Sequence, residues 1–248
     1  MNDPAPPSRL PISLLIAGLS ILALATSFFF RPAPVETDSA LLRSGPGLSV
    51  VNDDLGVEFT PSVISGDGLI FYPGARVEPE SYAWLGVGLA ERGHPVFVAR
   101  FPLDFALFAP ARALAIRKAH PELGRWAIGG HGLGGEVAAS FAHDHPGSAT
   151  ALVLLASMPP YPADLSSSNL RALLVTASED GIATESEVDR RFRLLPPTTR
   201  RVVIEGGNHA QFGEYGEEQG DGHSKIEGNR QRAMTVDAIL SFLEGEGG

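Results

Sequence analysis

Short, almost purely apolar stretches alternate with amphipathic stretches through most of this 248-residue chain, and this alternation most restricts the possible folds. Residues 150–156 (TALVLLA) and 170–177 (LRALLVTA) lack the polar alternation of a half-exposed strand, which indicates strands buried on both faces. The stretches between the strands carry apolar residues at helical spacing. Strands are expected at 68–72, 95–101, 125–130, 150–156, 170–177 and 200–205, and helices at 80–92, 105–120, 184–194 and 229–243. This order predicts an α/β fold with a mostly parallel central sheet and helices on both faces.

The most specific local signal is the turn Gly130-His131-Gly132-Leu133-Gly134, which joins the strand at 125–130 to an amphipathic segment at 136–141. Its form is Gly-x-Ser-x-Gly, a sharp strand-to-helix turn that exposes a nucleophile, except that glycine occupies position 132. Glycine has no side chain that could attack a carbonyl. Ser140, Ser157 and Ser178 do not lie on the turn and are poor substitutes. The turn is therefore expected without its nucleophile.

Two further loops follow expected strands. Asp180 lies in a Ser-Glu-Asp-Gly loop after the strand at 170–177, and His209 lies in a glycine-rich loop after the strand at 200–205. Ligands of parallel sheets bind at the carboxyl ends of the strands, so these loops are expected near the turn at Gly132. Asp180 would then orient the imidazole of His209, and the other ring nitrogen would accept a proton. Glu179 is the alternative acid.

The same edge of the sheet offers backbone donors and walls for a substrate. The N–H of Leu133, directly after the turn, and an N–H of Gly74 or Ala75 are the expected donors to an oxyanion. The segment at 157–169 is too short for a cap domain, so the site is expected to be open. Three aromatic residues are expected as walls of the substrate pocket, namely Tyr161, Phe212 and Tyr215.

Several of these motifs occur together in one known group of proteins. Tyr72-Pro73-Gly74, the glycine-rich turn, Asp180-Gly181, residues 206–213 (GGNHAQFG) and residues 220–222 (GDG) resemble a small, cap-less branch of the α/β-hydrolase superfamily. The resemblance extends over residues 68–243. It implies an ester hydrolase of the serine type, with Asp180 as the acid, His209 as the base and position 132 as the nucleophile position. The chain departs from the pattern there, because the family has serine at this position.

That departure leaves several functions open. The first hypothesis is a hydrolase of the serine-ester type that is inactive or very slow in its present form. The second is a membrane-tethered pseudoenzyme that binds a small molecule or partner without turnover. A third is hydrolysis by a water molecule that His209 and Asp180 activate. Gly132 fits a natural loss of the nucleophile as well as a deliberate removal.

The N-terminal region predicts a membrane anchor. Residues 10–30 contain no charged residue and are long enough to span a bilayer. A cleaved signal peptide, with a small-x-small site at 23–25, is the alternative; it would give a secreted domain. Residues 1–31 are thus assigned to the anchor, 32–47 to a linker and 48–248 to the hydrolase domain. Related hydrolases often carry such an anchor.

The composition excludes several kinds of partner and of reactive site. The chain carries 19 basic and 29 acidic residues, a net charge of -10, which argues against nucleic acid as a partner. It has no cysteine, so disulfides and a cysteine nucleophile are excluded. His143 and His145, and the acidic loop with Glu214, Glu217, Glu218 and Asp221, match no metal-binding pattern. The expected ligand is a small ester-like molecule, with no cofactor or metal.

Overall fold

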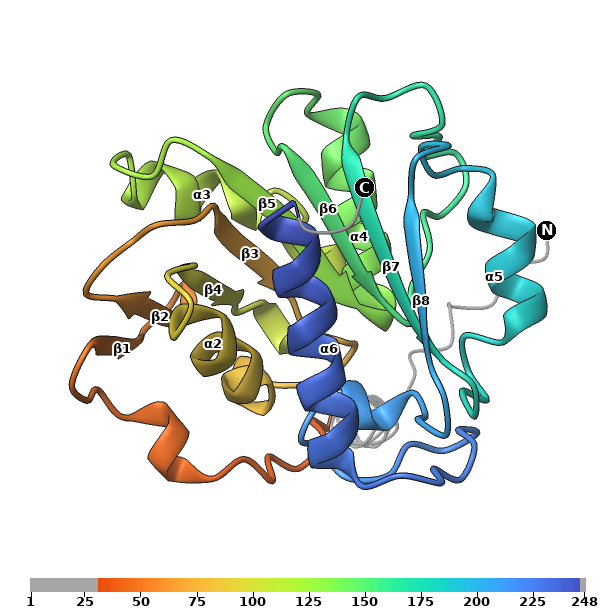
Figure 1. Cartoon of the computed structure of the whole chain (residues 1–248), viewed down its shortest axis with the longest axis horizontal. Coiled ribbons are helices and arrows are strands. Elements are labelled where there is room, and N and C mark those ends of the chain that lie inside the picture. The colour runs from red at the N-terminus through yellow and green to blue at the C-terminus, as the bar shows by residue number, and fades with distance from the viewer. Residues whose placement is uncertain (1–30, 246–248) are drawn as a thin grey trace, which may run out of the picture. The chain divides into compact units, whose positions relative to one another are not determined.

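The computed structural model describes residues 31–245 and contains one eight-stranded sheet (Figure 1). The strand order is β1-β2-β4-β3-β5-β6-β7-β8. β1 pairs antiparallel with β2, and β2 pairs antiparallel with β4, whereas every other neighbouring pair is parallel. The strands are β1 (Leu48–Asn52), β2 (Gly56–Pro61), β3 (Gly68–Tyr72), β4 (Val96–Ala99), β5 (Trp126–His131), β6 (Ala151–Leu155), β7 (Arg171–Ala177) and β8 (Arg200–Ile204). The predicted mostly parallel α/β fold is confirmed.

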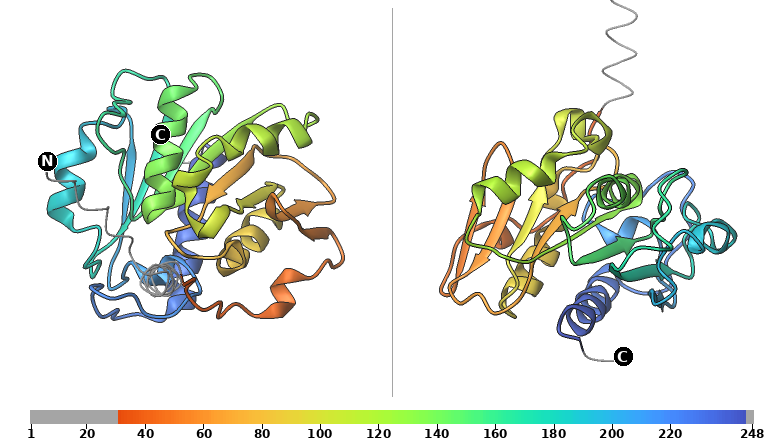
Figure 2. Two further views of the ribbon diagram at one scale, coloured as in Figure 1. Left: turned by 180° about the vertical axis from the view of Figure 1, so that it is seen from behind. Right: turned by 90° about the horizontal axis from the view of Figure 1, so that it is seen from above.

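Helices cover both faces of the sheet (Figure 2). They are α2 (Ala83–Ala90), α3 (Arg112–Ala119), α4 (Gly132–Asp144), α5 (Glu185–Phe192) and α6 (Gly228–Leu243). Successive residues of a strand point to opposite faces. Leu69 and Phe71 therefore pack into the core under α2 and α6, while Ile70 and Tyr72 pack into the core under α3, α4 and α5. These two buried layers fix the carboxyl ends of the parallel strands, where the loops with candidate site residues begin.

Two predicted helices are shorter than expected, and each is preceded by a 3₁₀ turn. Residues 105–120 form a 3₁₀ turn at Ala106–Phe108 and then α3, because Pro110 lies between them. Proline has no N–H to donate and disfavours helical conformation in the residue before it. Residues 80–92 likewise divide into a 3₁₀ turn at Pro79–Tyr82 and α2. Further 3₁₀ turns lie at Ser39–Leu42, Pro102–Asp104 and Ala210–Phe212.

The segment expected to be a linker, residues 32–47, is attached to the sheet domain along its length. The N–H of Ala33 donates to the carbonyl of Arg76 (2.8 Å), and the N–H of Glu36 donates to the carbonyl of Glu214 (2.9 Å). The Thr37 hydroxyl donates to the carbonyl of Glu80 (2.9 Å). The antiparallel strands β1 and β2, which the sequence pattern did not predict, extend the sheet beyond β4.

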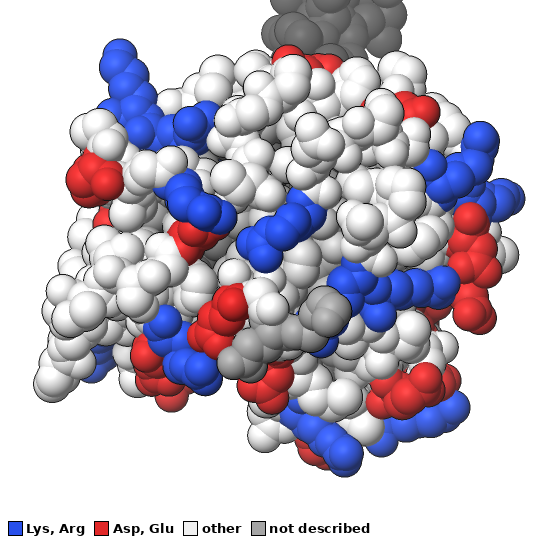
Figure 3. All heavy atoms as spheres, turned by 45° about the horizontal axis from the view of Figure 1, so that its top comes forward, with Lys and Arg blue, Asp and Glu red and all other residues white. Residues whose placement is uncertain are grey.

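The predicted anchor at residues 10–30 lies outside the described residues. Within 31–245, no helix is both long and apolar enough to cross a membrane. On the face that Figure 3 shows, acidic and basic side chains are interspersed and separated by uncharged surface.

Candidate active site

The strand-to-helix turn forms as the sequence predicts. β5 ends at His131, and α4 begins at Gly132, whose φ is +50°. The register of the sheet pairs Tyr72 with Gly130 and His131 with Leu155, so the loops after β3 and β6 lie beside the turn. A Cβ atom on Gly134 would come within 2.1 Å of the Pro73 carbonyl oxygen. Glycine there allows the helix to approach the neighbouring loop this closely.

Asp180 and His209 form a buried hydrogen-bonded pair next to the turn. Nδ1 of His209 lies 3.0 Å from Oδ2 of Asp180, and the carboxylate can only accept, so the imidazole donates this bond. The other oxygen of Asp180 accepts from the N–H groups of Ile182 (2.8 Å) and Ala183 (2.7 Å). Nε2 of His209 is thereby left as the acceptor. It faces the turn, because a Cβ on Gly132 would lie 3.2 Å from it.

The surroundings of this pair raise the pKa of the His209 imidazole. Burial lowers the pKa of His209, but the hydrogen bond and the charge of Asp180, with smaller effects of Glu218 and Asp221, raise it above 6.5 overall. Glu179, the alternative acid, instead pairs with Nζ of Lys225 at 2.8 Å. The structure therefore brings Asp180, and not Glu179, to His209.

A third carboxylate, Asp221, joins the loops of the acid and the base. Its Oδ1 accepts from the N–H groups of Gly181 (3.1 Å) and His209 (3.2 Å), and its Oδ2 accepts from the N–H of Ala210 (2.9 Å). From the sequence, Asp221 was expected only as part of the acidic loop and of the Gly-Asp-Gly run at 220–222, with no role in the site. The available signal was the Gly-Asp-Gly run at 220–222: Gly220 has a φ of +94°, and a Cβ on Gly222 would come within 2.0 Å of the Glu179 carbonyl oxygen.

The structure distinguishes the candidate oxyanion donors by the partners of their N–H groups. The N–H of Leu133 lies in the first turn of α4, where it has no partner within the helix. The N–H of Gly74 donates to the hydroxyl of Tyr82 (3.0 Å), so it does not point into the site. The N–H of Ala75 has no acceptor among residues 31–245. Leu133 and Ala75 are thus the available donors, and the expectation for Gly74 is corrected.

His131 lies beneath the ring of His209. It is 1% exposed, and the two ring centroids are 4.4 Å apart. Burial, with a further contribution from His209, holds the pKa of His131 well below 6.5, so it is neutral. Its Nδ1 lies 2.9 Å from the Tyr82 hydroxyl, which accepts from Gly74 and has its own proton to donate. Tyr82 thereby connects the loop of Ala75 to the turn of Gly132.

The pair opens onto a cavity of about 290 Å³. Gly132, Leu133, Ala75 and His209 line it on one side. Its other walls combine apolar residues with four charged ones and comprise Val77, Ala156, Met158, Ile182, Ala183, Val188, Tyr215, Glu136, Glu187, Arg191 and Glu218. Arg191 is paired with Glu136 (2.8 Å) and Glu187 (2.9 Å). An uncharged acyl group fits such a wall.

Of the three aromatic residues expected as walls, one lines the cavity. Tyr215 does so, and its hydroxyl donates to Glu218 (2.9 Å). Phe212 is fully buried behind the ring of His131 and forms part of the core. Tyr161 is 60% exposed and lies outside the cavity, where its hydroxyl accepts from Arg193. The positions of Phe212 and Tyr161 therefore correct the expectation.

None of the three neighbouring serines replaces the missing hydroxyl. Ser157 lines the cavity, but its hydroxyl donates to the carbonyl of Gly132 (2.7 Å). Ser140 bonds within α4 to the carbonyl of Glu136 (3.0 Å). Ser178 accepts from the N–H of Gly206 (2.8 Å) and does not line the cavity. Position 132 thus offers space above the turn and no nucleophilic side chain.

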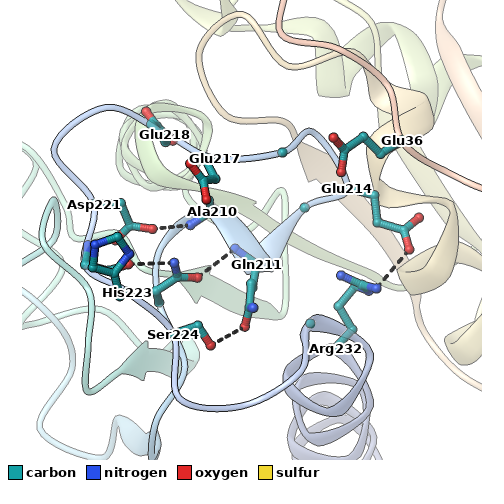
Figure 4. Close-up of a pocket in the computed structure, with 15 residues that line it drawn as sticks. Glu36, Ala210, Gln211, Glu214, Glu217, Glu218, Asp221, His223, Ser224 and Arg232 are labelled. Atoms are coloured by element: carbon teal, nitrogen blue, oxygen red, sulfur yellow. Dashed lines mark hydrogen bonds and ion pairs between the residues drawn. The ribbon is translucent and has the colours of Figure 1, made fainter.

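A second, larger cavity of about 640 Å³ is lined by neighbours of His209, among them Ala210 and Gln211 (Figure 4). Glu36, Glu217 and Glu218 line it together with the ion pair of Glu214 and Arg232 (3.1 Å). Figure 4 shows Asp221 at its edge, bonded to the backbone of Ala210. Glu218 of the acidic loop lines both this cavity and the candidate site.

Comparison with known proteins agrees with the fold. The model of the alpha/beta hydrolase family matches residues 68–233. No curated protein matches the chain significantly. Among solved structures, a predicted CIB-like hydrolase from Thermoplasma acidophilum is similar at a TM-score of 0.58 and 13% identity, covering 78% of this chain and 99% of that one.

Two similar structures are esterases by name. Est1E from Butyrivibrio proteoclasticus has a TM-score of 0.57 and 11% identity, covering 80% of this chain and 99% of that one. The thermophilic esterase Est2 from Thermogutta terrifontis has a TM-score of 0.54 and 14% identity, covering 82% of this chain and 96% of that one. At these identities the likeness is one of fold.

Proposed function

This chain belongs to the alpha/beta hydrolase family, and from that premise we propose that its site hydrolyses small, uncharged esters slowly, without a side-chain nucleophile. The observation that carries the proposal is the buried Asp180–His209 pair, whose free Nε2 faces the empty space above Gly132. A base in that position is able to activate a water molecule that occupies the place of the missing hydroxyl.

The proposed reaction is a single displacement. Nε2 of His209 accepts a proton from water as the water oxygen bonds to the ester carbonyl carbon. The N–H groups of Leu133 and Ala75 stabilise the negative charge that develops on the carbonyl oxygen. When the intermediate collapses, the bond to the alcohol oxygen breaks, and His209 returns the proton to that oxygen. Acid and alcohol leave without a covalent acyl-enzyme.

The rate is expected to be low because the nucleophile is absent. In a serine hydrolase, removal of a triad member leaves about 10³–10⁴-fold acceleration over water, which binding and the oxyanion donors supply. Restoring serine should therefore raise the rate steeply. Gly132→Ala is the matched control, because it adds the same Cβ atom without a hydroxyl.

The test is hydrolysis of p-nitrophenyl acetate and butyrate by the protein and by its Gly132→Ser, Gly132→Ala and His209→Ala variants. The proposal expects a gain of at least about 10³-fold for Gly132→Ser. It also expects a residual rate in the original protein that His209→Ala abolishes. A residual rate that His209→Ala leaves unchanged contradicts the water mechanism.

The alternative is a pseudoenzyme that binds a small molecule or partner in the 290 Å³ cavity without turnover. The glycine at position 132 favours it, since the turn carries no nucleophilic side chain. No gain from Gly132→Ser, with an unchanged circular dichroism spectrum, supports this alternative over the hydrolase.

We further propose that residues 10–30 tether the domain to a membrane, on the basis of their uncharged sequence. Extraction of membranes with alkaline carbonate tests this, because a spanning segment stays in the pellet. A soluble mature protein whose N-terminus follows residue 25 would instead show the secreted form.

A further inference from the structure

The segment between β4 and α3 presents apolar side chains to solvent. Residues 102–115 (PLDFALFAPARALA), here named the apolar rim, contain only two charged residues, Asp104 and Arg112. Leu103, Leu107 and Leu114 are 56%, 59% and 42% exposed. Apolar side chains exposed together on one segment mark an interaction surface, whereas single exposed ones are ordinary.

The apolar rim is firmly held in this exposed position. The hydroxyl of Tyr72 donates to the carbonyl of Pro110 (2.9 Å) and accepts from the N–H of Ala113 (2.9 Å). Leu103 and Asp104 have φ values of +55° and +56°, which residues with side chains rarely adopt. Such strain persists where the surroundings impose it, often at functional sites. The exposed apolar side chains therefore lie on a segment of fixed conformation.

We propose that the apolar rim is the surface on which the domain rests against a lipid bilayer with anionic headgroups. The path of the chain supports a lipid bilayer as the partner of this surface. The N–H of Ala33 donates to the carbonyl of Arg76 (2.8 Å), and the N–H of Arg76 donates to the carbonyl of Asp104 in the rim (2.8 Å). The chain thus enters the domain beside the rim, shortly after the uncharged sequence at 10–30.

Charge supports the same occupant. α3 begins within the rim and carries Arg112, Arg117 and Lys118 with no acidic residue. No ion pair involves any of these three side chains within 31–245. These side chains match the phosphates of anionic lipids, as in peripheral proteins that combine apolar insertion with basic side chains.

The experiment uses the full-length protein, which has no cysteine, so that a single introduced cysteine carries a fluorescent label. Leu107→Cys reports on the rim. Val63→Cys is the matched control, because Val63 is also apolar and 75% exposed. Val63 precedes Ser65, whose N–H donates to the carbonyl of Gly93. Gly93 lies just before β4, whereas the rim follows β4, so the two labels lie at opposite ends of that strand. Both proteins are labelled with NBD and added to vesicles of phosphatidylcholine and phosphatidylglycerol that contain brominated lipid.

The proposal expects bromine to quench the label at 107 at least threefold more than the label at 63. The difference should fall in vesicles of phosphatidylcholine alone and in the Arg117→Gln, Lys118→Gln variant. Equal quenching at both sites would overturn the proposal, as would failure of the protein to bind the vesicles. Shielding at 107 that grows with protein concentration, without bromine quenching, would assign the rim to a second copy of the chain and also overturn it.

Discussion

Replacing Asp221 with asparagine tests whether one carboxylate holds the two halves of the candidate site together. Oδ1 accepts from the N–H groups of Gly181, His209 and Gly222 at 3.1, 3.2 and 2.8 Å, and Oδ2 accepts from Ala210 at 2.9 Å. Asparagine has the same shape, but its NH₂ group has to face one of these donors. At least one backbone N–H therefore loses its acceptor.

The magnitude follows from these contacts. A hydrogen bond to a charged group contributes about 1.5–3 kcal/mol. The four bonds share one half-exposed carboxylate and are not additive, and water replaces part of them, so the expected loss is about 2–4 kcal/mol. A domain of this size loses about 2–4 °C in Tm per kcal/mol, which gives a decrease of roughly 4–16 °C.

Thermal unfolding monitored by circular dichroism measures this decrease. Asp54→Asn is the control, because Asp54 is exposed and its side chain makes no hydrogen bond among residues 31–245. In the Gly132→Ser background, Asp221→Asn should also lower kcat by about 10-fold or more, since small displacements of reacting groups reduce rates strongly. A Tm within about 1 °C of the original, with unchanged kcat, would refute the assignment.

Three more predictions concern the turn and its neighbours. Gly132→Ser and Gly132→Ala should each lower the free energy of unfolding by about 1–3 kcal/mol in urea titrations, because φ is +50° there and Cβ meets His209. The Gly132→Ser rate should rise with pH and reach half its maximum above pH 6.5, because only neutral His209 accepts a proton and its pKa is raised; a midpoint below 6.5 contradicts this. In the same background, Tyr82→Phe should lower kcat about 10-fold with little change in KM, because the N–H of Gly74 loses its acceptor.

The sequence predicted the sheet and the place of the site because both depend on short-range patterns. Continuous apolar runs identify parallel strands, and the residues directly after them must meet at one edge of the sheet. This reasoning placed Asp180, His209 and Gly132 in separate loops of the same edge. The structure brings the three together, with Nδ1 of His209 bonded to Asp180. The roles of the three residues in a reaction stay a prediction.

The features of the site that could not be predicted from the sequence depend on contacts between residues far apart in the chain. No local sequence pattern predicts that the Tyr82 hydroxyl accepts a hydrogen bond from the N–H of Gly74. That bond leaves Ala75, of the two alternatives, as the available donor. Aromatic residues near the loops were expected as walls, but Phe212 packs under His131 because its loop turns inward. Tyr161, on a longer loop, extends into solvent.

The buried acid–base pair also bears on whether the pocket catalyses or only binds. The side chains of His209 and Asp180 are 6% and 1% exposed, and removing such groups from water is costly. Exchange of a buried ion pair for apolar residues is often neutral or stabilises by about 1–4 kcal/mol. A pocket that only binds an apolar ligand gains nothing from a proton acceptor aimed at the space above Gly132. A pocket in which a proton moves needs that acceptor, so slow turnover accounts for the pair better than binding alone.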